Sequence, residues 1–442
     1  MSNSDTKWSA DGTNIPNIEP HTKTKHLLIE QYVTDLIYTL YGTVFPHGTD
    51  TFTFVDGFSG GGTYNDPESQ NTWSGSPIRL INAVREGYLK SKRISPLNVK
   101  FIFIDKNKQH LECLKNVAMR QAGLGQLSDE KPHTFKTEFP KGIGKRIEQC
   151  EFISDEFENK VNYCVFQAEQ RKGHSLFFLD PYGWSDVSME SFRKIINGLK
   201  KSEIIYTFMI DFIKRFIYDP KWTGRTTFEQ ILETDGYFDI NHFQTLDTFG
   251  EQAEFRNELI RLFRDRGNAK KIITFAMMPR NEQKVLYYLI HICSHLRGLE
   301  VMKDGSWNFN NLDYQYHYDI YGYGFRTAAY YEEHQLDLKL DINQDSETAC
   351  INKLSKDLDY LINNNPDGIS FKMLRAKTME LNPATRKHYC KYLQLLQDAK
   401  EIEIVSKGKK ITITEKTKLQ NSDIIRRSHQ QTLFALRPFI QR

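Results

Sequence analysis

A glycine-rich turn follows an acidic residue at the end of a β-rich run, in Phe-Val-Asp-Gly-Phe-Ser-Gly-Gly-Gly at residues 54–62. Such a turn lets a ligand approach the backbone, and its amides face a polar or anionic group. The spacing matches neither the G-x-G-x-x-G dinucleotide fingerprint nor a P-loop, which would close with Gly-Lys-Ser or Gly-Lys-Thr. The carboxylate of Asp56 would repel a pyrophosphate, but it suits a ligand with a cationic centre and an amine, such as S-adenosylmethionine. The alternative is a structural glycine turn in an α/β domain.

A second carboxylate, Asp105, ends the apolar run at residues 99–105. Ligands of open α/β sheets bind beyond the carboxyl ends of the strands, where a carboxylate can accept hydrogen bonds from ribose hydroxyls. An acid at a strand end is also a common helix N-cap, so Asp105 indicates a nucleoside only in combination with Asp56. Glu138, at the third expected strand, is a candidate contact to an adenine amine or else a solvated surface acid. The expected cofactor-binding residues are Asp56, Gly57, Phe58, Gly60, Gly62, Asp105 and Glu138.

The stretch Leu-Asp-Pro-Tyr-Gly-Trp at residues 179–184 has the groups that methyl transfer to an exocyclic amine requires. The lone pair of such an amine is delocalised into the ring, so acceptors must hold its N–H groups in line with the methyl group. Asp180 supplies a carboxylate and Pro181 a backbone carbonyl, and Tyr182 or Trp184 could stack on a flipped base. We therefore expect Asp180, Pro181 and Tyr182 to be catalytic. Alone, the stretch could also be a strand stopped by proline and a turn.

These residues need a sheet to bring them together, and the apolar pattern predicts one. The expected strands are residues 51–58, 99–107, 133–139, 175–184, 202–211 and 270–279. Their apolar residues run continuously rather than alternating, which is typical of strands buried on both faces of a parallel sheet. Helical patterns separate the strands, so we predict a doubly wound α/β fold. Residues 226–266 read as a helical insertion, and residues 282–297 as one helix with a buried apolar face.

The C-terminal part of the chain is basic, since residues 351–442 carry 18 Lys and Arg against 9 Asp and Glu. Three expected helices precede two alternating strands around a Lys-Gly-Lys turn at residues 401–414. Three helices and a hairpin predict a winged-helix-like domain, the alternative being a small helical accessory or dimerisation domain. Arg386, Lys387 and Lys391 on the third of these helices are candidate nucleic-acid contacts or a solvated face.

The predicted organisation has three parts. They are a flexible N-terminus at 1–22, a sheet domain at 23–340 and a basic winged-helix-like domain at 341–442. Arg215, after the fifth expected strand, is a candidate phosphate contact or a structural ion pair.

The composition of the 442-residue chain excludes several classes of protein. The 13% aromatic content argues against disorder, and a net charge of +3 argues against a histone-like polycation. None of the six cysteines forms a C-x-x-C pair, which argues against a zinc ribbon, and we expect no metal. The N-terminus has no apolar core of a signal peptide, and no apolar run reaches about 18 residues. We expect a cytoplasmic protein that does not engage a membrane.

In combination, the motifs resemble those of the three-Cys-motif partner proteins. The matching stretches, in chain order over about residues 23–307, are KHLLIEQYV, FTFVDGFSGGGTY, SGSPIRLI, FIFIDKN, SLFFLDPYGW and YYLIHICSHLRGLEVMKD. The resemblance implies a Rossmann-like class I methyltransferase that uses S-adenosylmethionine. It also implies a separate partner, an iron–sulfur radical enzyme with the three-cysteine motif. Asp56 and Gly60 match the first cofactor loop of the family, and Asp105 matches its ribose-binding acid.

The turn after the fourth strand is more distantly similar to the D-P-P-Y motif of amino methyltransferases that act on adenine or cytosine. The match covers Asp180 and Pro181; Tyr182 stands where those enzymes have a second proline, and Gly183 where they have the aromatic residue. We expect a methyltransferase that acts on an amine of a nucleic-acid base. The alternative is a degenerate methyltransferase fold that binds nucleic acid with its radical-enzyme partner, for example in phage defence or repair.

Overall fold

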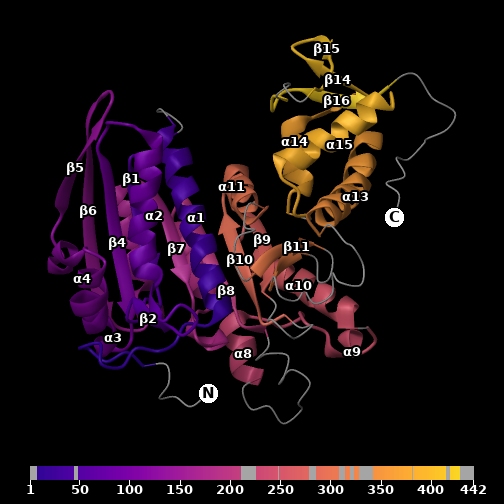
Figure 1. The fold of residues 1–442 in the computed structure, drawn as a ribbon. Helices are drawn as coiled ribbons and strands as arrows, with labels where there is room; N and C mark the ends of the chain where they lie inside the picture. Colours follow the sequence, from indigo (N-terminus) through magenta and orange to yellow (C-terminus); the bar gives the residue numbers. More distant parts are fainter. Residues whose placement is uncertain are drawn as a thin grey trace. The chain divides into compact units, whose positions relative to one another are not determined.

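The computed structural model describes residues 7–43, 48–210, 225–246, 248–277, 285–307, 314–318, 323–327, 342–380, 382–414 and 419–428. The chain divides into two compact units. The first covers residues 1–315 with 325–328, and the second covers 316–324 with 329–442 (Figure 1). Each unit has its own sheet, as expected for two separate cores.

A ten-stranded sheet in the order β11-β12-β9-β10-β8-β7-β1-β4-β6-β5 forms the centre of the first unit. Its parallel strands are β1 (Thr51–Asp56), β4 (Leu97–Asp105), β6 (Gly142–Ser154), β7 (His174–Leu179) and β8 (Ser202–Phe208). The chain proceeds from β1 to one side through β4 and β6, and later to the other side through β7 and β8. The strand order therefore reverses at β1, and ligands of open sheets bind beyond the carboxyl ends of strands at such a point.

The other strands of this sheet lie toward its two edges. They are β5 (His133–Phe139), β9 (Lys271–Met277), β10 (Tyr287–Cys293), β11 (Tyr314–Tyr318) and β12 (Tyr323–Thr327). β5 is antiparallel to β6, and β10 is antiparallel to both β8 and β9. All residues of β7, β8 and β10 are buried. Continuous apolar runs are what a sheet covered on both faces requires, so the predicted doubly wound α/β fold is confirmed.

Helices pack along the sheet in groups. α1 (Pro20–Gly42) packs against α2 (Ser76–Ser91) and α11 (Leu296–Trp307), and α5 (Phe157–Arg171) packs against α6 (Met189–Gly198). The predicted helical insertion is present as α8 (Arg225–Leu232), α9 (Ile240–Phe243) and α10 (Thr248–Asp265). The shorter elements are β2 (Thr63–Asp66), β3 (Asn71–Ser74), α3 (Lys108–Cys113), a π-helical turn (Leu114–Ala118), α4 (Met119–Gln121) and the 3₁₀ turns Gly125–Asp129 and Trp184–Asp186.

A buried polar cluster joins α1 to the sheet. Glu203 of β8 accepts a hydrogen bond from the Tyr32 hydroxyl and lies 2.9 Å from Nε2 of His291 and 3.2 Å from Nε2 of His174. Burial alone would raise the pKa of Glu203, but its hydrogen bonds and the charges of the two histidines hold that pKa well below its usual range. The carboxylate is therefore ionised and paired inside the core, and it fixes α1 on the face of the sheet.

Two elements differ from the sequence predictions. Residues 282–297 were expected to form one helix, whereas Tyr287–Cys293 is strand β10 and α11 begins at Leu296. A short apolar run buried on all sides has no periodicity that separates a strand from a helix, which explains the error. The N-terminus was expected to be flexible, yet its described part packs: Trp8 is 1% exposed, and Ile18 N–H donates to Asn65 O at 2.8 Å.

The described residues of the second unit form three helices and a four-stranded sheet. Its elements are α13 (Ile342–Asn363), β13 (Ile369–Ser370), α14 (Phe371–Thr378), α15 (Arg386–Asp398), β14 (Ile402–Ser406), β15 (Lys409–Ile411) and β16 (Ile424–Arg427). The strands pair in the order β13-β16-β14-β15, and the hairpin of β14 and β15 turns at Lys407 and Gly408. The predicted winged-helix arrangement is therefore present, with β16 as an additional strand that the sequence pattern did not reveal.

Candidate functional site

The loop after β1 is held between its two neighbouring strands. Gly57 N–H donates to Phe178 O of β7 at 2.9 Å, and Ser59 N–H donates to Ile104 O of β4 at 2.9 Å. Gly60 and Gly62 have φ of +57° and +73°, a left-handed conformation that only glycine adopts without steric cost. The glycines that the sequence singled out therefore fold the chain sharply across the carboxyl ends of β4, β1 and β7.

The two carboxylates predicted to hold a cofactor meet at this loop. Asp56 is the last residue of β1 and Asp105 the last of β4, and the Asp105 Oδ2 accepts from Gly60 N–H at 3.0 Å. The Asp105 Oδ1 accepts from Asn107 N–H at 2.8 Å and lies 3.0 Å from Nδ1 of His110. Asp56 thus precedes the glycine turn in the chain, and Asp105 holds the turn in place by accepting the hydrogen bond from Gly60 N–H.

Asp56 lies in an electrostatically unfavourable position. It has no exposed surface, and its two oxygens accept from Ser76 Oγ at 2.6 Å and from Phe58 N–H at 3.2 Å. Burial raises the pKa of Asp56 to about 7; these two hydrogen bonds oppose the shift, and the negative charges of Asp180 and Asp105 add to it. Three carboxylates therefore converge at the point where the strand order reverses, and a bound cation would relieve their repulsion.

An aromatic side chain from the N-terminal segment covers the glycine loop. A Cβ added at Gly60 would lie 3.0 Å from the Trp8 ring, and one at Gly61 would overlap that ring. The Trp8 indole N–H donates to Thr63 O, and its ring packs edge-on against His110 with centroids 5.0 Å apart. Close packing of Trp8 therefore explains why no side chain is present at these glycines. The sequence carried no signal for this contact, because the N-terminal segment is polar.

The catalytic candidate Asp180 follows β7 directly and is engaged by a lysine. Lys25 of α1 places its Nζ 2.6 Å from both carboxylate oxygens of Asp180. The ammonium also lies 5.2 Å from the centre of the Tyr287 ring. Pro181 is buried, whereas Tyr182 is 67% exposed and open to a stacking partner. Sequence reasoning missed Lys25 as a site residue, although it belongs to the KHLLIEQYV stretch.

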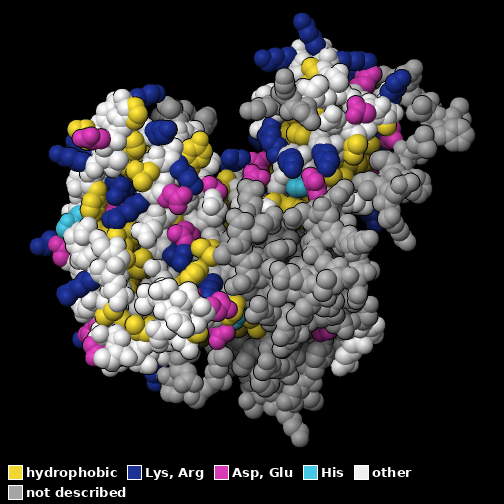
Figure 2. Space-filling view, in the orientation of Figure 1, with side chains coloured by type: hydrophobic (Ala, Val, Ile, Leu, Met, Phe, Trp, Pro, Cys, Tyr) yellow, Lys and Arg dark blue, Asp and Glu magenta, His cyan; other side chains and the backbone are white. Residues whose placement is uncertain are grey.

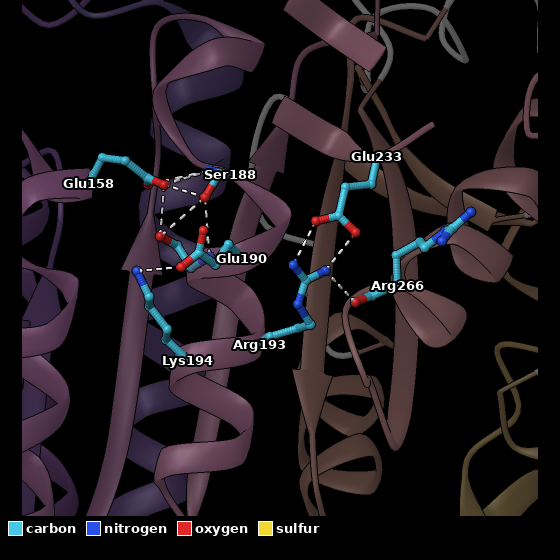
Figure 3. A network of polar contacts seen from close by, with 8 residues as sticks. Glu158, Ser188, Glu190, Arg193, Lys194, Glu233 and Arg266 are labelled. Atoms are coloured by element: carbon cyan, nitrogen blue, oxygen red, sulfur yellow. Dashed lines mark hydrogen bonds and ion pairs between the residues drawn. The ribbon is translucent and has the colours of Figure 1, made fainter. Parts of the chain in front are cut away.

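The turn that carries Asp180 is anchored where α6 begins. Glu158 of α5 accepts hydrogen bonds from Ser188 N–H and Oγ and, at 2.8 Å, from Ser191 Oγ (Figure 3). Ser188 Oγ in turn accepts from Ser191 N–H at 3.2 Å and caps the helix. Beyond the cap, Arg193 binds both oxygens of Glu233, at 2.7 and 2.6 Å. This network fixes the C-terminal side of the turn.

Glu138 does not belong to this site, and its assignment to an adenine contact is wrong. It lies on β5, where it pairs with Ile143 of β6. Asp105 pairs with Ser154, at the other end of β6, so about 11 residues or roughly 36 Å of strand separate the two levels of the sheet. The error arose because β6 was missed: its alternating charged residues concealed the strand that actually neighbours β4.

The predicted nucleic-acid contacts of the second unit have partners within that unit. Lys387 and Lys391 of α15 lie 3.6 and 3.3 Å from the two oxygens of Glu347. The Arg386 guanidinium donates to Leu419 O and lies 5.1 Å from the centre of the Phe371 ring. The side chains of Lys387 and Lys391 remain exposed, so they could exchange Glu347 for a phosphate. Arg386 instead holds the backbone at Leu419 within the unit.

Exposed cations gather instead on the hairpin of β14 and β15. Lys407, Lys409 and Lys410 lie at its turn, and Figure 2 shows dark blue side chains over this hairpin. Lys410 lies within ion-pair distance of Glu403, while for Lys407 and Lys409 the described residues include no ion-pair partner. The β14–β15 hairpin therefore presents more positive charge without an ion-pair partner, among the described residues, than α15 does.

The described part of the chain shows no metal site and no membrane span. It contains no group of three or more His, Cys, Asp or Glu side chains arranged to hold a metal ion. None of its helices combines the length and the apolar character that a membrane crossing requires. The Arg215 candidate and the side chain of Trp184 lie outside the described residues.

Comparisons with known proteins support the architecture of the second unit. A family model described as a GMT-like wHTH domain matches residues 328–409. A search of the curated proteins finds no match to the sequence.

Solved structures similar to the chain include three from different bacteria. A protein from Legionella pneumophila is 10% identical with a TM-score of 0.32, and the alignment covers 62% of this chain and 85% of that one. An O-methyltransferase from Bacillus cereus in complex with SAH is 9% identical with a TM-score of 0.28, over 65% and 98% of the chains. An O-methyltransferase from Streptomyces achromogenes in complex with SAM is 8% identical with a TM-score of 0.29, over 67% and 100%.

Proposed function

We propose that the protein is an S-adenosylmethionine-dependent methyltransferase that acts on a nucleic acid. The observation that carries this proposal is the convergence of Asp56, Asp105 and Asp180 at the reversal of strand order, with the pKa of Asp56 raised to about 7. Asp56 and Asp105 are buried, and the charges of Asp105 and Asp180 act on Asp56, so this cluster favours a ligand that is itself positively charged. S-adenosylmethionine carries a sulfonium and an ammonium, so its charge complements this cluster.

The residues of the first unit have the types that such a cofactor needs. Asp56 and the loop of Gly57, Gly60 and Gly62 would bind the methionine part, with Phe58 beside them. Asp105 would accept from the ribose hydroxyls, because its Oδ2 accepts only one of the hydrogen bonds described, from Gly60 N–H. The bound cofactor would supply an electrophilic methyl group at these strand ends. Entry requires the Trp8 ring, or the loop under it, to shift, since the ring lies directly over Gly60 and Gly61.

The sequence predicts an amine of a nucleic-acid base as the methyl acceptor. In that reading the carboxylate of Asp180 and the carbonyl of Pro181 accept the two N–H groups of the amine, and Tyr182 stacks on the base. The exposure of Tyr182 agrees with a stacking role. A base amine would have to displace the Lys25 ammonium from Asp180, because that ammonium contacts both carboxylate oxygens.

The second unit supports a nucleic acid as the substrate or partner. It matches a family model of a wHTH domain. Such domains typically bind DNA or RNA, although winged helices also bind proteins. The lysines of the β14–β15 hairpin would contact phosphates. The iron–sulfur radical-enzyme partner that the family resemblance implies stays a prediction.

The proposal is tested by labelled methyl transfer from S-adenosylmethionine to nucleic acid, with Asp180→Asn as the variant. Asp155→Asn is the matched control, because Asp155 follows β6 at the same edge of the sheet and, among the described residues, binds Asn159, Lys160 and the Glu156 N–H alone. We expect transfer by the unchanged protein and by the control, and a loss of at least about 100-fold in Asp180→Asn. Full activity of Asp180→Asn would contradict the assignment of Asp180.

A second candidate function is a nucleic-acid-binding module without catalysis. The observation that favours it is that side chains of the protein occupy both halves of the site: Trp8 lies on the glycine loop and Lys25 on Asp180. Such a protein would bind nucleic acid through the second unit and would transfer no methyl group. Labelled methyl transfer separates the two candidates, since transfer that Asp180→Asn abolishes excludes the second.

A further inference from the structure

The contact between Lys25 and Asp180 changes what the acceptor side of the site can bind. Lys25 is 5% exposed. Its ammonium has three N–H donors, and two of them donate to the two Asp180 oxygens, both at 2.6 Å. No further hydrogen bond to this ammonium is recorded in the described part of the chain. On the acceptor side of the site, Asp180 is therefore covered by a cation with one remaining donor, rather than being a bare carboxylate.

A donor of this kind suits an oxygen nucleophile better than an amine. An exocyclic amine has two N–H donors and a single lone pair, which it must use for attack, so it cannot also accept from Lys25. Its nitrogen also becomes positive as the new bond forms, which the adjacent ammonium opposes. A hydroxyl oxygen has two lone pairs, so one can accept from Lys25 while the other attacks. The ammonium also favours the partial negative charge that the oxygen gains as its proton leaves.

A proton acceptor lies one helical turn away on the same side of α1. His21 and Lys25 are four residues apart, and the His21 ring packs edge-on against the Tyr287 ring with centroids 5.8 Å apart. The Tyr287 hydroxyl donates to His21 O at 3.2 Å and holds this first turn in place. Burial, with the positive charge of Lys25, lowers the pKa of His21 to about 4, against the opposing charge of Asp180. The imidazole is therefore neutral at pH 7 and has a lone pair to accept a proton.

We infer that the acceptor of this site is a hydroxyl and, because the proposed substrate is a nucleic acid, the ribose 2′-hydroxyl of RNA. The inference rests on the proposed function. Away from the two ends of a nucleic-acid chain, the 2′-hydroxyl is the aliphatic hydroxyl available, and DNA lacks it. Lys25 binds and orients the oxygen, Asp180 holds Lys25, and His21 takes the proton. In the transfer an O–CH₃ bond forms while the S–CH₃ bond breaks; the sulfur keeps that electron pair as a neutral thioether, and the hydroxyl proton moves to the imidazole.

The position of the transferred methyl group tests this inference directly. The probe is a pool of single-stranded RNA oligonucleotides of random sequence, incubated with the full chain and methyl-labelled S-adenosylmethionine; a DNA pool of the same design is the second arm. Digestion to nucleosides and mass spectrometry then locate the label. We expect 2′-O-methyl nucleosides from RNA and no label in DNA. Label on a base in either pool overturns the hydroxyl assignment and leaves the methyltransferase proposal standing.

Label in neither pool, with cofactor binding intact, overturns the hydroxyl assignment as well. A folded chain that binds no S-adenosylmethionine overturns both this inference and the proposed function, so the two failures are distinguishable by titration.

A binding experiment without cofactor gives an independent readout for Lys25. Lys25→Met removes the donor and keeps the length of the side chain, and Lys23→Met, on the same helix and paired with Asp66 and Glu68, is the control with the same change of charge. We expect Lys25→Met to reduce affinity for a single-stranded RNA oligonucleotide about tenfold, to that of its DNA counterpart. Thermal unfolding checks that both variants fold. An RNA preference that persists unchanged in a folded Lys25→Met protein contradicts the role of Lys25.

Discussion

Replacing Asp56 by asparagine should stabilise the protein at neutral and alkaline pH. The pKa of this buried carboxyl is raised from 3.8 to about 7, so folding binds a proton near neutrality. The stability that the protonated form contributes is fully present below about pH 4 and is lost as the pH rises through 7. At 1.36 kcal/mol per pH unit, ionising Asp56 in the fold costs about 4 kcal/mol by pH 8.

The amide has the same shape and carries no charge at any of these pH values. It can still accept from Phe58 N–H, and the Ser76 hydroxyl can rotate to accept from the new NH₂ group. We therefore expect the free energy of unfolding of Asp56→Asn to exceed that of the unchanged protein by about 2–4 kcal/mol at pH 8 and by only about 1 kcal/mol near pH 4.5.

Urea unfolding of the first-unit transition at pH 4.5, 6, 7 and 8 measures this difference. Asp155→Asn serves as the control, because hydrogen bonds from Asn159 and Lys160 and from Glu156 N–H lower the pKa of the partly exposed Asp155 to about 2. This control should show no gain at pH 8. If Asp56→Asn were less stable than the unchanged protein by the same amount at every pH, the carboxylate cluster would not be strained and the argument for a cationic ligand would lose its basis.

Three further substitutions probe other parts of the structure. Glu203→Gln should lower the free energy of unfolding by about 3–5 kcal/mol, because it leaves the buried histidines without their carboxylate; urea unfolding measures it, and a loss below 1 kcal/mol would contradict the pairing. Trp8→Ala should cost about 3–5 kcal/mol, and an unchanged melting temperature would show that the ring does not pack on the loop. Replacing both Lys407 and Lys409 by alanine should lower the slope of log affinity against log salt for nucleic acid by about 2, whereas replacing both Lys387 and Lys391, which pair with Glu347, should change it less; equal effects would refute the preference for the β14–β15 hairpin.

The fold could be predicted because most strands of its central sheet are runs of mainly apolar residues. Runs such as residues 99–105 and 202–208 are buried throughout, and continuous apolar runs between helical patterns leave few alternatives to a parallel sheet. Elements with mixed patterns were missed or misread. β6 alternates charged and apolar residues near the edge of the sheet, and β10 is apolar on both faces. The spacing of apolar residues alone therefore could not identify β6 as a strand or distinguish β10 from a helix.

The placement of the candidate site residues was predictable where each lies at the end of a strand, and not where distant segments meet. Asp56, Asp105 and Asp180 each end or follow a strand, and parallel pairing brings such ends together. Lys25 is 155 residues from Asp180, and Trp8 is more than 50 residues from the loop it covers. No sequence period encodes these contacts, which depend on how α1 and the N-terminal segment pack. The inference that the acceptor is a hydroxyl rests on one of these contacts, between Lys25 and Asp180.

The most direct test of the central claim is a calorimetric titration of the intact protein with S-adenosylmethionine at pH 8 and pH 6. With a pKa of about 7, Asp56 is about nine-tenths ionised at pH 8 and about one-tenth at pH 6, so the affinity should be about tenfold lower at pH 6. Asp56→Asn should bind weakly at both. Binding of equal strength at the two pH values, or none by the folded protein, would contradict the assignment of this strand-end cluster to a cationic cofactor.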